Sequence, residues 1–141
     1  MKIRISKTRP DAVIPEYKTR GACCFDLHCL EDVVLAPGEI ADLPTGLIFA
    51  VPEGYMLMVA PRSSTPKKGL HMPHGIGIID QDFRGPEDEL RLRIRNFTDA
   101  PVEIRKGDRV CQAGFVRVDR FEWEEGPPLA SETRGGFGTT G

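Results

Sequence analysis

Residues 90–95 read Leu-Arg-Leu-Arg-Ile-Arg, and this strict alternation of apolar and charged side chains decides the fold class. Successive side chains of a β-strand point to opposite faces, so the pattern predicts a strand with one buried and one solvated face. Strand-like runs recur along the chain at residues 2–6, 39–43, 47–51, 55–60, 102–104 and 110–118. The chain is therefore expected to consist of many short strands.

Turn sequences separate these runs and leave little room for helices. Glycine and proline number 15 and 12, and they cluster in segments such as Ala36-Pro37-Gly38, Arg84-Gly85-Pro86 and Lys106-Gly107-Asp108. Such segments end strands and form tight turns. The sequence predicts an all-β sandwich, jelly roll or closed barrel, with at most a helical turn or two near residues 66–70.

The composition is that of an ordinary globular domain. The chain has 141 residues, of which 40% are hydrophobic and 28% charged, with a formal net charge of −2. This length predicts one domain, and the charge argues against sequence-independent binding to nucleic acid, which requires a basic excess. No apolar run approaches the roughly 18–20 residues that cross a bilayer. The N-terminus alternates charged and apolar residues, unlike a signal peptide, so a cytoplasmic protein without a membrane partner is expected.

Four cysteines and two spaced histidines raise the question of a metal or a disulfide. Cys23, Cys24 and Cys29 crowd into one segment and Cys111 lies far away, a spacing unlike that of a zinc ribbon. We expect four small buried hydrophobic side chains in a reducing compartment. The pair His71-x-x-His74 lacks convincing thiol or carboxylate partners for a metal.

Residues 60–69 follow an apolar strand and concentrate polar donors in one turn. Arg62 offers a planar donor fork that matches phosphate oxygens, and Ser63, Ser64 and Thr65 add hydroxyl groups. The segment is either a phosphate-binding loop or a solvated loop whose hydroxyl groups bond to its own backbone.

A carboxylate follows the apolar run Gly77-Ile78-Ile79. Asp80 is expected on a hairpin whose second strand is the run at 90–95, where its position would suit a base that activates water. Asp82 would share its face by the two-residue period of a strand. The alternative is a turn in which both aspartates accept hydrogen bonds from the backbone.

Two further segments carry isolated polar side chains. Asp26 lies in an apolar stretch, where an unpaired carboxylate would be costly. Asp108 and Arg109 are expected to pair within a structural turn, and Gln112 would project its amide from the following strand.

The C-terminal residues 124–141 show no periodic apolar pattern. They are either a disordered, glycine-rich terminus or a flap that orders over a ligand. In a flap, glycine N–H groups would bind phosphate oxygens and the ring of Phe137 would cover a base.

Taken together and in order, these segments resemble the five motifs of the trimeric deoxyuridine triphosphatases. The matching stretches run from residue 22 to the last residue: Cys24-Phe25-Asp26-Leu27, Pro61-Arg62-Ser63-Ser64 with Lys68-Gly69, Gly77-Ile78-Ile79-Asp80-x-Asp82-Phe83, Gly107-Asp108-Arg109-x-x-Gln112, and Gly135-Gly136-Phe137-Gly138-x-Thr140-Gly141. The resemblance implies a jelly-roll homotrimer with active sites shared between subunits. It also implies Mg²⁺-dependent hydrolysis of dUTP to dUMP and pyrophosphate, which limits uracil in DNA and supplies dUMP for dTMP synthesis.

The resemblance also assigns roles to residues of this chain. Asp80 would activate the water that attacks the α-phosphorus, and Asp26 would hold waters of the Mg²⁺ shell. The triphosphate ligands would be Arg62, Ser63, Ser64 and Gln112. The base and sugar would contact His74, Gly77, Ile78, Ile79, Phe83 and Arg91, and the tail would close with Arg134, Phe137, Gly138 and Thr139.

Some positions depart from the family pattern. Phe83 stands where the family usually has tyrosine, His74 where it often has asparagine, and residues 86–89 lengthen the turn before Arg91. Arg134 lies two residues closer to Phe137 than the arginine usual in this motif. The position at the usual spacing is occupied by Glu132.

Two other functions stay open from the sequence alone: the related dCTP deaminase, and a protein that binds the nucleotide without turnover. We expect a β domain at residues 1–124 and a tail with the fifth motif at 125–141.

Overall fold

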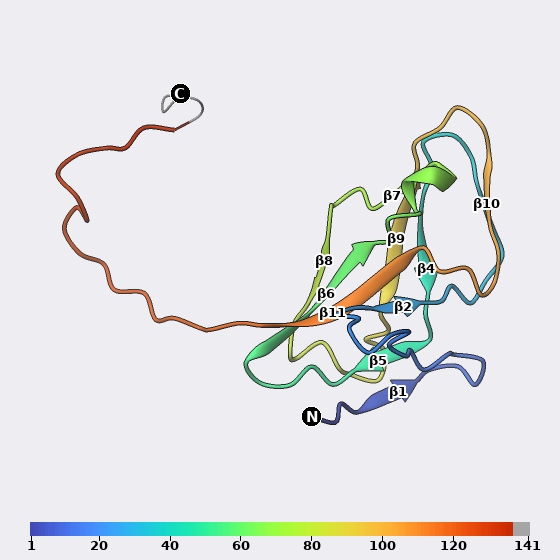
Figure 1. Cartoon of the computed structure of the whole chain (residues 1–141), viewed down its shortest axis with the longest axis horizontal. Helices are drawn as coiled ribbons and strands as arrows, with labels where there is room; N and C mark the ends of the chain where they lie inside the picture. The colour runs from blue at the N-terminus through green and yellow to red at the C-terminus, as the bar shows by residue number, and fades with distance from the viewer. Residues whose placement is uncertain (137–141) are drawn as a thin grey trace.

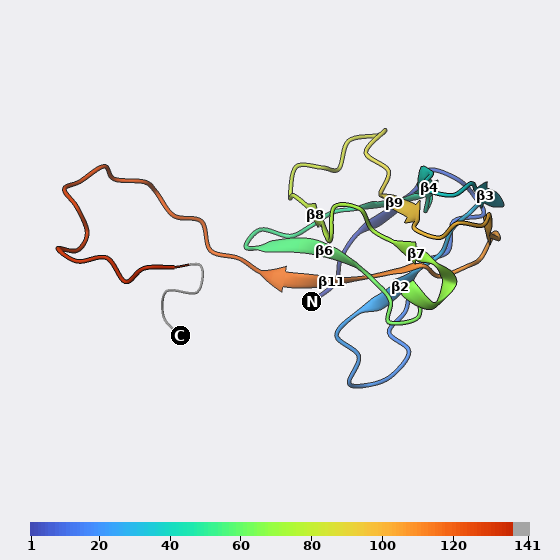
Figure 2. The same ribbon diagram turned by 90° about the horizontal axis from the view of Figure 1, so that it is seen from above.

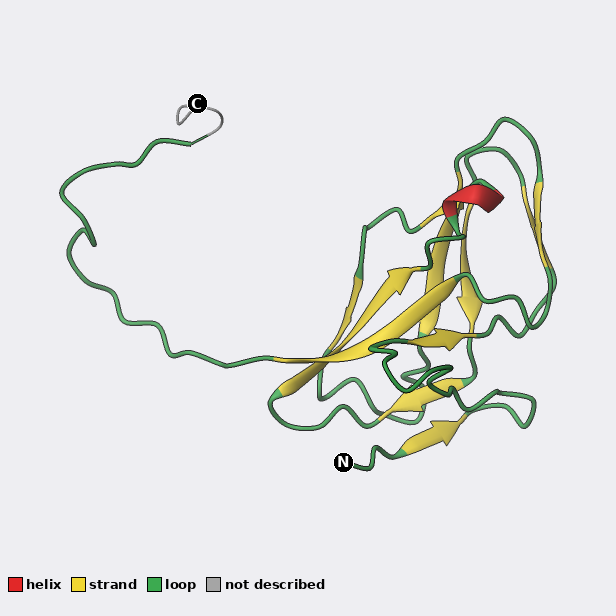
Figure 3. Cartoon of the chain, viewed as in Figure 1, coloured by secondary structure: helices red, strands yellow, loops and turns green. Residues whose placement is uncertain are grey.

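The structure, a computed structural model, describes residues 1–136. Within this part of the chain nearly all regular structure is β-strand, and one 3₁₀ turn interrupts it (Figure 3). The elements are β1 (Ile5–Lys7), β2 (Phe25–Leu27), β3 (Val33–Leu35), β4 (Ile40–Pro44), β5 (Leu47–Phe49), β6 (Tyr55–Pro61), η1 (Pro66–Lys68), β7 (Leu70–His71), β8 (Gly77–Ile79), β9 (Arg91–Asn96), β10 (Val102–Ile104) and β11 (Cys111–Arg117).

The strands form antiparallel sheets that close around one core. A four-stranded sheet has the order β2-β11-β6-β8 and a three-stranded sheet the order β4-β9-β7, and the pairs β1-β5 and β10-β3 complete the wall. The two views at right angles show these sheets wrapped into a distorted barrel of the jelly-roll type (Figures 1 and 2). The predicted all-β, jelly-roll fold class is confirmed.

The alternating segment behaves as predicted. Leu92 and Ile94 in β9 are fully buried, whereas Arg91, Arg93 and Arg95 face outward. The core that they join is contributed by most strands and includes Leu27, Leu35, Leu43, Leu57 and Ile104, each with no exposed surface.

The predicted strands appear with their boundaries shifted by a few residues at most, and η1 confirms the expected helical turn. Strands β2, β3 and β7 are not among the predicted runs. Each has three residues or fewer, too short for a two-residue period to stand out, and the pairings β2–β11, β3–β10 and β7–β9 define them instead.

One pairing contradicts the sequence-based expectation. β8 was expected to form a hairpin with β9, but it pairs with β6, and β9 pairs with β4 and β7. The reason is that β8 and β9 belong to different sheets, so the loop between them crosses from one sheet to the other.

Beyond β11 the chain leaves the barrel. The Val118 amide still donates to the Gly54 carbonyl at 2.9 Å, and residues 119–136 then extend away from the sheets without a strand or helix (Figures 1 and 2). Phe121 and Trp123 in this stretch are 74% and 93% exposed. No helix within residues 1–136 has the length and apolar character needed to span a bilayer.

Candidate active site

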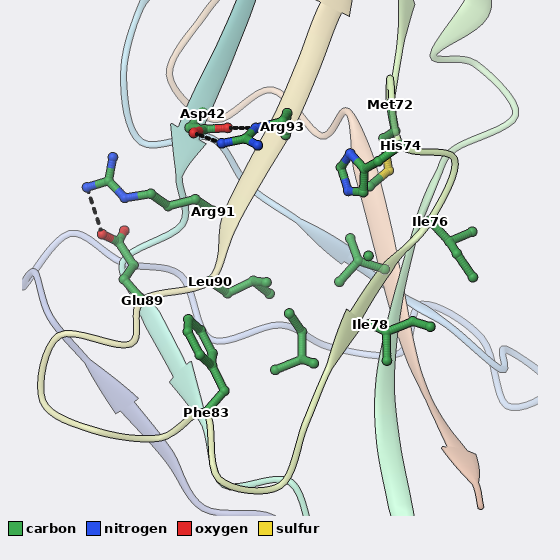
Figure 4. Close-up of a pocket in the computed structure, with 13 residues that line it drawn as sticks. Asp42, Met72, His74, Ile76, Ile78, Phe83, Glu89, Leu90, Arg91 and Arg93 are labelled. Atoms are coloured by element: carbon green, nitrogen blue, oxygen red, sulfur yellow. Dashed lines mark hydrogen bonds and ion pairs between the residues drawn. The ribbon is translucent and has the colours of Figure 1, made fainter.

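A pocket of about 400 Å³ lies in the gap between β8 and β9 (Figure 4). It is lined by side chains and backbone of both strands, of the loop before β8 and of the turn after it. All six residues that the sequence predicts around a base and sugar are part of its wall: His74, Gly77, Ile78, Ile79, Phe83 and Arg91.

The pocket exists because two strand edges face each other without pairing. β8 uses one edge to pair with β6, with Val59 opposite Gly77, and no ladder joins its other edge to β9 within the described residues. A Cβ on Gly77 would lie 3.3 Å from Val59 Cβ, so glycine permits this close approach. Unpaired strand edges present N–H and C=O groups in a fixed order. The gap can therefore bind a flat ligand with complementary donors and acceptors.

Ion pairs line the side of the pocket formed by β4, β9 and the segment just before β9. Arg93 donates through Nε and an Nη to the two carboxylate oxygens of Asp42, both at 2.7 Å, and Arg91 pairs with Glu89 at 3.3 Å (Figure 4). The guanidinium of Arg93 holds the pKa of the Asp42 carboxyl below its usual value. Sequence reasoning did not place Asp42, Glu89 or Arg93 at the pocket. Asp42 belongs to β4, which lies far from β8 in the sequence, and no motif marked the other two.

Asp80 directly follows β8 and lies in a second, neighbouring pocket of about 540 Å³. Ile78 lines both pockets, so the two pockets are neighbours, and Asp80 follows the β8 residues of the first pocket directly in the chain. Asp82 lines the second pocket as well. Both aspartates lie after the end of β8, in the turn, so the predicted two-residue period of a strand does not apply to them. They line the same pocket because of the turn.

A second cluster of predicted residues gathers around Asp26. Its carboxylate pairs with Arg62 Nε at 2.7 Å and with an Nη of Arg109 at 3.1 Å, and its side chain is 14% exposed. The expected cost of an unpaired carboxylate is thus avoided by two guanidinium groups. Arg62 also donates to the Arg109 carbonyl at 3.1 Å, so the three side chains form one network.

Arg109 corrects an expectation. It pairs with Asp26 and not with Asp108, whose carboxylate instead accepts from Lys68 Nζ and the Arg105 amide, both at 3.2 Å. The cause is the β2–β11 register, which places Cys111 opposite Leu27 and so brings the chain before β11 next to Asp26. Arg109 is a site residue that local sequence context alone did not reveal.

His28 is another residue at this cluster that sequence reasoning missed. Burial, and then the charge of Arg109, lower the pKa of its imidazole. Its Nδ1 is buried without a hydrogen-bond partner in the described part of the chain. No sequence motif marks this histidine.

The turn after β6 leaves donors available beside the cluster. Thr65 Oγ1 donates to the Val110 carbonyl at 2.5 Å and accepts from the Arg62 amide at 3.1 Å, which fixes the turn. Within residues 1–136 the amides of Ser63 and Ser64 have no protein acceptor. Gln112 donates to the Pro61 carbonyl at 3.2 Å, on the same side of the sheet as Asp26.

The two clusters are far apart within one chain. In the β6–β8 ladder Leu57 lies opposite Ile79, so Asp80 is next to Met56. Arg62 follows six residues further along the chain. At roughly 3.3 Å per residue this separation is about 20 Å. The structure therefore does not bring Asp80 together with Arg62.

The cysteines conform only in part to expectation. All four are free thiols, Cys29 and Cys111 are buried, but Cys23 is exposed and Cys24 half-buried because both lie in the loop before β2. Burial raises the pKa of the Cys111 thiol to about 12, which keeps it protonated and unreactive.

The described residues contain no group of three or more His, Cys, Asp or Glu side chains placed to bind a metal ion. Asp26, already neutralised by two guanidinium groups, suits contact with a hydrated cation better than direct coordination. The donor set thus fits a cation that arrives on a polyphosphate.

The predicted tail residues are only partly within the described structure. Arg134 is exposed and makes no side-chain hydrogen bond or ion pair within residues 1–136. Phe137, Gly138 and Thr139 lie outside the described residues.

The fold and pockets define a β-barrel protein in which a pocket between two unpaired strand edges lies next to a carboxylate. The family model described as dUTPase matches residues 10–141. Deoxyuridine 5'-triphosphate nucleotidohydrolases of Nautilia profundicola and of Hydrogenobaculum sp. are each 40% identical, and their alignments cover 100% of this chain and 99% of the relative.

Solved structures agree with this result. A dUTPase from Streptococcus mutans is 28% identical with a TM-score of 0.76, over 84% of this chain and 98% of that one. The dUTPase of Staphylococcus bacteriophage 80alpha, a G164S mutant with dUpNHpp, is 23% identical with a TM-score of 0.88, over 99% of this chain and 98% of that one; it supports the fold. The chain belongs to the dUTPase family.

Proposed function

We propose that the pocket between β8 and β9 binds the uracil of dUTP, which the chain, as a dUTP diphosphatase, hydrolyses to dUMP and pyrophosphate. The observation that carries this proposal is the gap between two unpaired strand edges, next to a carboxylate, in a member of the dUTPase family. This activity limits the incorporation of uracil into DNA and supplies dUMP for dTMP synthesis.

Backbone groups of Gly77, Ile78 and Ile79 read the edge of the base. A fixed pattern of N–H and C=O groups that matches uracil meets the amino group of cytosine with a donor against a donor, and each buried mismatch costs about 1–3 kcal/mol. Phe83 closes the pocket under the deoxyribose, where its ring leaves no space for a 2′-hydroxyl.

Arg62, the free amides of Ser63 and Ser64, and Gln112 bind the triphosphate. Their support is the concentration of donors beside Asp26. Arg109 shares the Asp26 carboxylate with Arg62, so Arg62 keeps donors for a phosphate while remaining oriented.

The separation of about 20 Å between Asp80 and Arg62 supports an assembly in which different subunits supply them. The two clusters can act on one substrate when the base pocket of one subunit faces the Asp26 cluster of another. We assign the chain to a homotrimer on this ground and on its family.

dUTPases depend on Mg²⁺, which neutralises the charge that develops on the leaving pyrophosphate. In this chain Asp26 would hold the ion through water. Asp80 accepts a proton from a water molecule as the water oxygen bonds to the α-phosphorus in line with the leaving group. The bond from the α-phosphorus to its bridging oxygen breaks, and dUMP and pyrophosphate leave.

Residues 125–141 act as a tail that follows a β domain at residues 1–124. Arg134 would contact the γ-phosphate, Gly138 and Thr139 would donate to phosphate oxygens, and Phe137 would cover the base. Support comes from the extended, uncovered course of the described residues after β11. The four free cysteines support a cytoplasmic location.

A nucleotide panel tests this function. The protein is incubated with dUTP, UTP, dCTP and dTTP, with Mg²⁺ or with EDTA, and pyrophosphate and ammonia are measured. We expect pyrophosphate only from dUTP, and only when Mg²⁺ is present. Ammonia from dCTP would instead indicate a deaminase, and tight dUTP binding without products would indicate a binding protein.

A further inference from the structure

The second pocket, which adjoins the base pocket, holds charged side chains that are not paired with one another. Its volume is about 540 Å³, and its charged wall residues are two carboxylates and two guanidinium groups: Asp80, Asp82, Arg84 and Arg120. Within residues 1–136 none of these four side chains makes an ion pair or a hydrogen bond. Among the other polar side chains of the wall, that of Gln81 donates to the Tyr55 carbonyl at 3.2 Å.

This lack of pairing contrasts with the other two regions of the site. In the base pocket, Arg91 and Arg93 each pair with a carboxylate. At the Asp26 cluster, Arg62 and Arg109 share one carboxylate. In the described part of the chain, by contrast, both guanidinium groups of the second pocket keep all five N–H donors for a ligand. A planar donor fork of this kind matches the oxygens of a phosphate.

The fold brings the two arginines to Asp80 from distant parts of the chain. Arg84 lies in the turn that follows β8, where its amide donates to the Asp82 carbonyl at 2.9 Å. Arg120 follows β11, whose last residue lies opposite Tyr55 at the start of β6. Because β6 pairs with both β11 and β8, the end of β8, the start of β6 and the end of β11 meet at one end of the four-stranded sheet (Figure 1).

The proposed reaction places an anion in this pocket. A water molecule that Asp80 activates lies within hydrogen-bond reach of its carboxylate, about 3 Å, and next to the α-phosphorus that it attacks. The non-bridging oxygens of the α-phosphate are then close to a second negative group, and the two repel each other. Guanidinium groups in the same wall offset this repulsion and stabilise the charge on the phosphate oxygens during the attack.

We propose that Arg84 and Arg120 bind the non-bridging oxygens of the α-phosphate beside Asp80 and are two further catalytic residues of this site. The inference rests on the proposed hydrolysis of dUTP with Asp80 as the base. It divides the phosphate contacts between subunits. These two arginines serve the α-phosphate in the subunit that holds the base, whereas the Asp26 cluster of another subunit serves the triphosphate.

The test compares deoxyuridine and dUMP as competitive inhibitors of dUTP hydrolysis. The two differ only in the phosphate, so the ratio Ki(deoxyuridine)/Ki(dUMP) reports the binding of that phosphate. We expect Arg84→Met and Arg120→Met each to lower the ratio about tenfold, the value of one charge-assisted hydrogen bond, with the Ki of deoxyuridine unchanged. The kcat for dUTP should fall at least about tenfold as well, because the same contacts act in the transition state.

Arg117→Met is the matched control, because Arg117 is an exposed arginine close to Arg120 in the sequence but outside the pocket wall. It should keep the ratio within about twofold of the wild-type value. Arg84→Lys and Arg120→Lys retain the charge without the planar fork, so we expect a loss of about threefold from each. These variants replace a methionine variant that does not fold.

A ratio that is unchanged in the variants of both pocket arginines would overturn the inference. An equal rise in the Ki of both inhibitors would also overturn it, because the arginines would then act on the fold or on the base pocket and not on the phosphate. A wild-type protein that releases no pyrophosphate from dUTP with Mg²⁺ would instead overturn the proposed function.

Discussion

The base pocket and the Asp26 cluster are built on opposite principles. The pocket is a gap between unpaired strand edges, open and already shaped within one chain. At the Asp26 cluster, both guanidinium groups are already paired with the carboxylate. A flat base with fixed donors and acceptors is matched by rigid backbone, whereas a highly charged triphosphate requires cations that are held in place until it arrives. In the function proposed above, selectivity and charge neutralisation are therefore separated in space, and catalysis depends on bringing the two regions together.

Asp80→Asn tests whether the carboxylate next to the pocket serves chemistry alone. The amide is nearly isosteric but a poor base, so kcat should fall by about 10³-fold or more while the Ki of dUMP stays within about threefold. Steady-state kinetics and inhibition by dUMP provide both values. Asp82→Asn, in the same pocket, is the matched control and should retain most activity. Equal losses in rate and affinity for Asp80→Asn would contradict its role as the base.

Deletion of residues 135–141 tests whether the tail joins the two regions over the substrate. We expect kcat/KM for dUTP to fall about 10²-fold or more, because water would reach the reacting groups and the fifth motif would be lost. The melting temperature should stay within about 1 °C, since the described residues after Val118 are largely exposed. Glu132→Gln, an exposed tail residue, should change neither value. A clearly lower melting temperature of the truncated protein would show instead that the tail stabilises the fold.

Phe83→Ala tests whether the pocket excludes ribose by contact. Without the ring, the ratio of kcat/KM for UTP to that for dUTP should rise about tenfold or more. Parallel assays of both nucleotides provide the ratio. Phe97→Ala removes an aromatic ring of similar exposure outside the pocket and serves as the control. Unchanged sugar discrimination in Phe83→Ala would argue against the steric explanation.

Arg109→Met tests whether the pairing of Asp26 with two arginines matters for binding the triphosphate. With one guanidinium lost, Arg62 must neutralise Asp26 alone, so kcat/KM for dUTP should fall about tenfold while the Ki of deoxyuridine is unchanged. Arg105→Met, which breaks an exposed pair with Glu103 at 3.0 Å, should leave both values as they are. A loss of deoxyuridine affinity in Arg109→Met would show that the two regions are not separate.

Asp42→Asn tests the ion pair in the pocket wall and should have the smallest effect. Because Arg93 lowers the pKa of Asp42 from 3.8, the pair stabilises the fold above that value, and the contribution is lost as the pH falls through the lowered pKa. The side chains are 38% and 57% exposed, so the loss at neutral pH should be at most about 0.5 kcal/mol.

Urea unfolding at several pH values measures this difference, which should vanish in strong acid. Asp99→Asn, at an exposed position without an ion pair in the described structure, is the control. A difference that grows in acid would contradict the assigned sign.

Sequence reasoning was most successful where one local rule was sufficient. Residues 90–95 alternate strictly, and β9 buries Leu92 and Ile94 as predicted. Six predicted residues do line one pocket, because they lie close together along the chain or on the strand that follows. The partner of Arg109 was predicted wrongly, since its nearest carboxylate in the sequence is Asp108 but its nearest carboxylate in space is Asp26.

The sequence by itself determined the all-β class, the order of the motifs and the chemical groups available, because alternation, turn residues and functional groups are local properties. Only the tertiary structure decided that β8 and β9 stay apart, that Asp42 and Arg93 form a wall of the pocket, and that Asp26 joins two arginines. Strand pairing joins segments that are distant in the chain, and it results from how the whole barrel buries its apolar faces.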